Sequence, residues 1–225
     1  MKLNVSFFSL VAVTILFLGA CERPPELSSV PIIEFESVEY RVVEGRADSL
    51  IITISFEDNE GDLGVDRVND PPAINYPKDA QGNYISISSS PDLPPYHACD
   101  YIIDPVINGV QINDTILYEM DQDFYNYRID FYRKINGQYR EFDIRREFGV
   151  NSCLPKDRNY FRLNTQPNDR PLQGSLRYAY GSIIFGTVFR PSDTLRVDIQ
   201  IMDRALNKSN IVSSPDFTLN GVKVE

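Results

Sequence analysis

The chain is poor in the residues on which most metal and nucleic-acid sites depend. Its 225 residues include one His, no Trp and three Cys, and its 22 Lys and Arg are outnumbered by 32 Asp and Glu. A single His argues against metal sites with several imidazole ligands. The net charge of −10 argues against a nucleic-acid partner, which would require a basic surface. No phosphate loop, dinucleotide fingerprint or Gly-x-Ser-x-Gly motif occurs in a suitable context, so we predict no catalytic residue and no enzyme activity.

The N-terminal segment is predicted to be a signal peptide and not part of the fold. Residues 5–18 form an almost unbroken apolar stretch that is too short for an ordinary transmembrane helix. The stretch ends in Leu-Gly-Ala-Cys at 18–21, which resembles a bacterial lipobox and implies cleavage before Cys21 and acylation of that residue. The alternative is a plain secretory signal whose Cys is incidental. We expect residues 1–20 to be removed and 21–31 to form a tether. Cys21 would then anchor an outer-membrane lipoprotein of the cell envelope, facing the periplasm or the surface.

If Cys21 carries the lipid, Cys99 and Cys153 are the two remaining cysteines. In an oxidising compartment two such cysteines most simply pair, and both lie in turn-like segments that contain proline. The alternative is two separately buried thiols. His97 lies two residues before Cys99, but one such pair does not complete a zinc site or make a nucleophile of an oxidised Cys.

The dominant hydrophobic period of the mature chain is two, which is typical of β-strands. One strand face is apolar over 50–56, 125–131 and 195–201. Asn136-Gly137 is the strongest short hairpin signal, because both residues tolerate a positive φ. Weaker strand candidates are 33–43, 84–88, 115–119 and 175–189, whereas the proline-rich stretch 66–104 predicts long ordered loops. We predict one all-β domain over 32–225, a two-sheet antiparallel β-sandwich.

Two segments resemble known bacterial sequences. The segment 199–210 resembles the late hairpin of bacterial immunoglobulin-like domains, with Leu206 where such motifs carry Gly. The segment 55–64 resembles a strand-plus-acidic-turn signature in Bacteroidota lipoproteins of unassigned function. Those chains pair it with a Tyr-rich hairpin and an Arg/Pro/Leu segment, here 125–139 and 162–172. The resemblance implies an immunoglobulin-like form of the sandwich, but it implies no reaction.

The acidic turn is the best candidate for a ligand site. Four carboxylates lie within nine residues, at Asp58, Glu60, Asp62 and Asp66. They offer the hard oxygen ligands that Ca²⁺ requires. The spacing is not that of an EF-hand, because Gly61 is at the fourth position and the twelfth residue is Asn69. The alternative is a metal-free turn in which Gly61 and Gly64 supply positive φ angles.

A tripeptide of Asp, Ser or Thr, and an apolar residue occurs three times, with the hydroxyl residue at Ser49, Thr115 and Thr194. It is similar to the O-glycosylation motif of envelope proteins in Bacteroidota. The alternative is a turn residue that leads into a strand. An exposed tyrosine such as Tyr132 could bind a sugar or a protein partner, although most such residues are cross-strand packing pairs.

These patterns favour a non-catalytic envelope lipoprotein that binds or scaffolds a protein partner and is held at the membrane by its lipid. The alternative is a glycan-binding accessory lipoprotein of a surface nutrient-uptake system. A weaker one is a glycosidase whose carboxylate pair forms only in the folded chain. No cofactor is expected unless the acidic turn binds calcium.

Overall fold

The computed structural model describes residues 28–42, 48–68, 74–90, 93, 96–97, 99–143, 153, 156–164, 170–181 and 188–224. The predicted signal peptide, residues 21–27 of the tether and the lipidation candidate Cys21 lie outside the described residues. The fold is all-β, as predicted, and the described part has one short 3₁₀ helix, η1 (Gln122–Phe124). No helix among these residues is long and apolar enough to cross a membrane.

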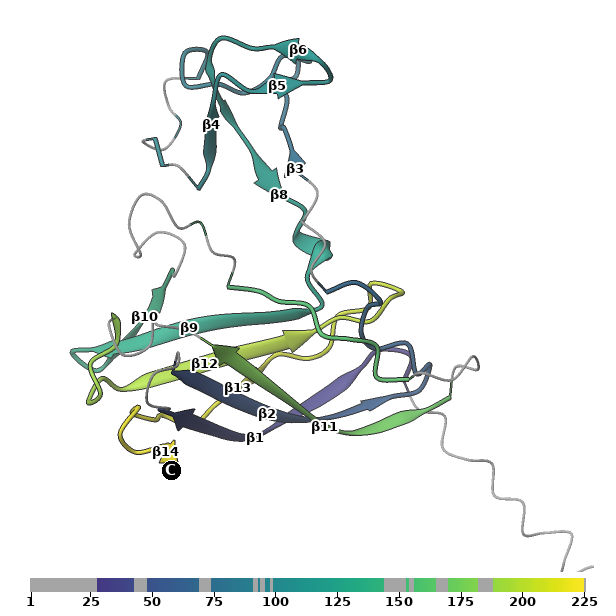
Figure 1. Ribbon diagram of the computed structural model, residues 1–225, viewed down its shortest axis with the longest axis vertical. Coiled ribbons are helices and arrows are strands. Elements are labelled where there is room, and N and C mark those ends of the chain that lie inside the picture. The colour runs from purple at the N-terminus through teal and green to yellow at the C-terminus, as the bar shows by residue number, and fades with distance from the viewer. Residues whose placement is uncertain are drawn as a thin grey trace, which may run out of the picture.

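Eight strands form two four-stranded sheets, which together we call the body (Figure 1). The first sheet has the order β11-β2-β1-β14, in which only the β1–β14 pair is parallel. The second has the order β10-β9-β12-β13 and is antiparallel throughout. The strands of the body are β1 (Ile32–Arg41), β2 (Ser49–Asp58), β9 (Tyr127–Ile135), β10 (Gln138–Phe142), β11 (Leu172–Gly181), β12 (Leu195–Ile201), β13 (Val212–Ser213) and β14 (Lys223–Val224).

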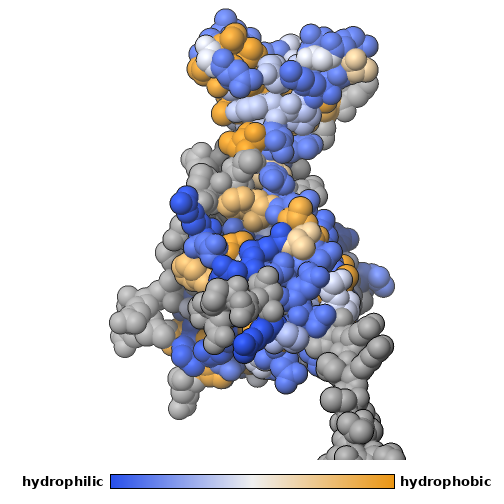
Figure 2. Space-filling view, turned by 90° about the vertical axis from the view of Figure 1, so that its right-hand side faces the viewer, coloured by the Kyte–Doolittle hydropathy of each residue, from blue (hydrophilic) through white to orange (hydrophobic). Residues whose placement is uncertain are grey.

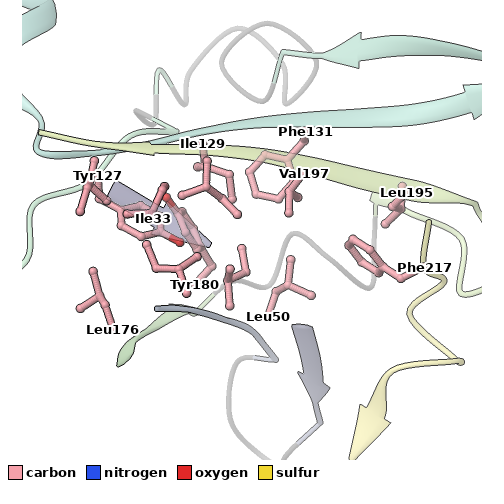
Figure 3. Close-up of a cluster of buried hydrophobic side chains, with 14 of the residues drawn as sticks. Ile33, Leu50, Tyr127, Ile129, Phe131, Leu176, Tyr180, Leu195, Val197 and Phe217 are labelled. Atoms are coloured by element: carbon pink, nitrogen blue, oxygen red, sulfur yellow. The ribbon is translucent and has the colours of Figure 1, made fainter. Parts of the chain in front are cut away.

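The apolar faces of the two sheets form a common core. Along β12, buried residues alternate with half-buried ones from Leu195 to Ile201, as the period of two predicts. Figure 3 shows that side chains of β9 and β12 point toward those of β1, β2 and β11. Aromatic rings join the sheets, because Tyr127 of β9 stacks on Tyr178 of β11 with ring centroids 4.9 Å apart. Tyr180 of β11 makes an edge-to-face contact with Phe131 of β9, with ring centroids 5.9 Å apart.

The turn between β9 and β10 confirms the predicted hairpin. Asn136 and Gly137 have φ angles of +52° and +80°. Two positive φ angles are the pattern of a two-residue turn whose twist matches that of the strands.

Residues 74–121, between β2 and β9, project from the body and are called the arm (Figure 1). Its strands are β3 (Ile74–Asn75), β4 (Tyr101–Ile103), β5 (Val106–Ile107), β6 (Val110–Gln111), β7 (Thr115–Leu117) and β8 (Glu119–Met120), paired two by two. Long loops were expected over 66–104, so β3 and β4, which both lie in this stretch, were missed. The arm also holds an ordered turn at 79–83, because Asp79 Oδ1 accepts the backbone N–H groups of Gln81 and Asn83.

The disulfide between Cys99 and Cys153 is present, as predicted. Cys99 lies two residues before β4 in the arm, and Cys153 lies shortly before the stretch in which Arg158 pairs with Tyr127 of β9. The bridge therefore ties the arm to a segment that runs along the body.

Candidate functional site

The acidic turn begins where β2 ends. Asp58 is the last residue of β2, and its Oδ2 accepts the backbone N–H of Asp62 at 3.0 Å. Gly61 and Gly64 have φ angles of +68° and +88°. A Cβ atom at Gly61 would lie 2.0 Å from the carbonyl oxygen of Arg170, so only glycine fits this close approach. The turn thus has the backbone form that its two glycines predicted.

The structure adds a third carboxylate, Asp203, from the other sheet. Asp203 follows the end of β12 and pairs with Leu63 in an isolated β-bridge. One oxygen each of Asp58, Asp62 and Asp203 lie within 4.8 Å of one another, and all three residues are buried. We call these three residues the acidic cluster. The cluster joins the end of β2 to the end of β12.

Backbone N–H groups hold the carboxylates in place. Asp62 Oδ2 accepts the N–H of Ala205 at 3.2 Å, and Asp203 Oδ1 accepts the N–H of Asn207 at 2.7 Å. Asp58 Oδ1 and Asp62 Oδ1 are buried and have no hydrogen-bond partner among the described residues. Such orphaned oxygens are rare in folded proteins and call for a partner.

Burial governs the electrostatics of the cluster. It raises the pKa of Asp58 and of Asp62, and the negative charge of Asp203 raises both further. The Arg204 guanidinium acts in the opposite direction on the pKa of Asp62. The hydroxyl of Tyr160 is also buried without a hydrogen-bond partner among the described residues, and all three carboxylates raise its pKa beyond the effect of burial. A cation at this point would oppose each of these effects.

Two of the four carboxylates predicted for calcium are not brought into the cluster. Glu60 is exposed, and Asp66 has 74% of its side-chain surface exposed and pairs with Arg162 at 3.8 Å. Asp203 was missed because it lies far along the chain from Asp58 and Asp62. The sequence offers one signal for Asp203, because this residue lies in 199–210, one of the two segments that resemble known bacterial sequences.

The remaining predicted sites lie elsewhere. Ser49 and Thr115 begin β2 and β7, Thr194 directly precedes β12, and all three are half-buried. His97 Nδ1 accepts the backbone N–H of Cys99 at 3.2 Å, which gives this side chain a local structural role.

Tyr132 is half-buried on the outer face of the second sheet, near the exposed Tyr139. The Arg196 guanidinium lies over both rings, 4.7 and 4.3 Å from their centroids. These cation–π contacts occupy one face of each ring, so that face is not free to stack on a sugar.

A cleft of about 610 Å³ lies between the arm and the outer face of the second sheet. Its arm side includes Asp100, Tyr101 and Glu119, and its body side includes Arg128 and Lys156. Six carboxylates line it against these two basic side chains, at Asp100, Glu119, Asp121, Asp130, Asp157 and Asp198. The cleft is therefore predominantly acidic.

The arm carries large apolar side chains on its surface. Figure 2 shows hydrophobic residues on the surface of the arm. Among the exposed large apolar residues are Ile103, Val106 and Val110, which we call the arm tip. The β5–β6 hairpin, which holds Val106 and Val110, lies at the end of the arm farthest from the body (Figure 1). Such a concentration on a small projecting element is typical of an interaction surface.

Comparison with known proteins finds no matching family model, no matching curated protein and no matching solved structure.

Proposed function

We propose that this chain is a non-catalytic lipoprotein of the bacterial cell envelope, and that its arm binds a protein partner. In this proposal the body is an immunoglobulin-like β-sandwich, and Cys21 carries the lipid that holds the chain at the outer membrane. The proposal also places the chain among the Bacteroidota lipoproteins that it resembles.

The observation that carries the proposal is the apolar arm tip. Val106 and Val110 are 63% and 60% exposed, which leaves both side chains in water at the end of a projecting hairpin. Burying an apolar side chain stabilises a complex by about 1.5–3 kcal/mol. The acidic cleft lies beside the base of the arm, so we expect the partner to present an apolar surface flanked by basic groups.

The test is crosslinking in native envelopes followed by recovery of the tagged chain. We expect the wild-type chain to recover one protein reproducibly, and the Val106→Ser/Val110→Ser variant to lose it. Phe161→Ser is the matched control, because Phe161 lies outside the arm and is 64% exposed. Equal recovery by the arm-tip variant and the wild-type chain would contradict the proposal.

The anchor is tested separately by fractionation. We expect Cys21→Ala to move the chain from the membrane to the soluble fraction, because it removes the thiol that would carry the lipid. A chain that stays with the membrane after this change would contradict the lipid anchor, without bearing on the arm.

A further inference from the structure

We propose that the acidic cluster binds one Ca²⁺ ion, which clamps the end of β2 in the first sheet to the end of β12 in the second. This site does not depend on the proposed partner or on the lipid anchor.

The first argument is the set of unsatisfied oxygens. Asp58 Oδ1, Asp62 Oδ1 and Tyr160 Oη are all buried, and no described residue donates a hydrogen bond to them. Asp58 and Tyr160 are only 1% and 5% exposed, so bulk water does not solvate them. A buried carboxylate oxygen without a partner is costly, and a bound cation removes that cost.

The second argument is the independent placement of Tyr160. Tyr160 belongs to neither turn of the cluster, yet its carbonyl oxygen accepts the backbone N–H of Val65 at 3.0 Å, and the charges of all three carboxylates raise the pKa of its hydroxyl. A tyrosine hydroxyl can donate to a ligand water or offer its own lone pair. Polar side chains from three separate parts of the chain thus contribute to this buried site.

The chemistry of the donors favours Ca²⁺. Carboxylate and hydroxyl oxygens suit hard cations, and no His or Cys belongs to the cluster, which disfavours zinc. Ca²⁺ takes several protein oxygens at about 2.3–2.6 Å, whereas Mg²⁺ keeps several waters and is usually bound through one or two carboxylates. The cluster offers three carboxylates with oxygens within 4.8 Å of one another, which is a donor set of the kind that Ca²⁺ binds. Their remaining oxygens and ordered waters can complete the six to eight ligands that Ca²⁺ takes.

The position of the site predicts that the ion stabilises the contact between the two sheets. Asp62 and Asp203 are already linked through the backbone, because Arg204 N–H donates to the carbonyl oxygen of Asp62 at 3.4 Å. The ion would replace repulsion between the carboxylates with attraction, at the point where the ends of two sheets meet. Calcium should therefore stabilise the whole body and not only the turn.

The test is thermal unfolding of the full chain in detergent, first in EDTA and then with added Ca²⁺. We expect Ca²⁺ to raise the melting temperature by about 5–10 °C at a concentration a hundredfold above its dissociation constant. Asp62→Asn should reduce the Ca²⁺ affinity by at least about tenfold, because it removes a charged ligand. The same variant should melt no lower than the wild-type chain in EDTA, because it removes a buried negative charge.

Matched controls lie in the same turn. Glu60→Gln and Asp66→Asn each remove a carboxylate outside the cluster, and we expect them to change the Ca²⁺ affinity by less than about twofold. A second readout is terbium luminescence excited through tyrosine, which we expect Tyr160→Phe to reduce strongly.

Three results would overturn the proposal. The first is equal melting of the wild-type chain in EDTA and in Ca²⁺, which would mean that water satisfies the buried oxygens. The second is an equal loss of affinity in Glu60→Gln and Asp62→Asn, which would place the ion on the exposed turn. The third is unchanged terbium luminescence in Tyr160→Phe, which would place the ion away from Tyr160.

Discussion

Replacing Gly61 with Ala tests the close backbone approach that shapes the acidic turn. Gly61 has a φ of +68°, and Gly137 in the β9–β10 hairpin has a φ of +80°. At either position the left-handed conformation costs Ala about 1–2 kcal/mol. The two positions differ in space, because a Cβ at Gly61 would lie 2.0 Å from the Arg170 oxygen and a Cβ at Gly137 would meet nothing within 4 Å.

The expected loss of unfolding free energy follows from this difference in the space around the two glycines. A Cβ contact below 3.0 Å essentially never occurs, so Gly61→Ala requires a shift of at least 3.0 − 2.0 = 1.0 Å between the turn and the Arg170 backbone. Relieving an overlap in a packed region typically costs about 1–3 kcal/mol. The loss of unfolded-state entropy, about 0.4–1 kcal/mol, is common to Gly61→Ala and Gly137→Ala and cancels between them. We therefore expect Gly61→Ala to lower the free energy of unfolding by about 1–3 kcal/mol more than Gly137→Ala.

The assay is urea unfolding followed by far-ultraviolet circular dichroism. With a slope of about 2 kcal/mol per molar urea, the midpoint for Gly61→Ala should be about 0.5–1.5 M lower than that for Gly137→Ala. Equal midpoints for the two variants would refute the close approach between the turn and Arg170.

Three further predictions use the same kind of measurement. The Cys99→Ser/Cys153→Ser variant should lose up to about 4 kcal/mol of unfolding free energy, because the bridge spans a sequence separation of 54; an unchanged urea midpoint would contradict this. Leu206 has a φ of +68° and is exposed, so Leu206→Asn should raise the unfolding free energy by up to about 1 kcal/mol; a destabilised variant would show that the leucine side chain has a packing role. Burial raises the pKa of Asp157 above 3.8, so the folded chain binds more protons there than the unfolded chain and its stability falls as pH rises from about 4 through the raised pKa. Asp157→Asn keeps an acceptor for the Ile129 N–H but does not titrate, so the free energy of unfolding of the variant minus that of the wild-type chain should increase as pH rises from about 4. A difference that does not change with pH would contradict the raised pKa of Asp157.

Local periodicity was enough to predict the all-β class and several strands of the body, but not the parallel β1–β14 pair. The alternation along 195–201 and the Asn136-Gly137 turn depend on residues adjacent in the chain, and both appear in the structure as predicted. The disulfide was also predictable, because only Cys99 and Cys153 remain once Cys21 is assigned to the lipid.

The arm and the full acidic cluster were not predictable by such means. The arm is built from strands of two or three residues, which are too short to show a clear hydrophobic period, and only β7 lies within a strand candidate, 115–119. The cluster depends on which strand ends meet, and the contact between Ala205 and Asp62 joins residues 143 positions apart. Glu60 and Asp66 have the right chemistry and the right neighbours in sequence, but the turn directs both side chains to water.

The central claim, that the arm binds a protein partner, is tested most directly by site-specific photo-crosslinking in native envelopes. A photoreactive residue is placed at one position at a time, at Val106 or Val110 in the arm tip and at Phe161 or Ile32, two control positions outside the arm. All four side chains are exposed, so the substitution should leave the fold intact at each. We predict that both arm-tip positions crosslink to the same protein and that neither control position does. Crosslinks to one protein from the control positions alone would contradict the account.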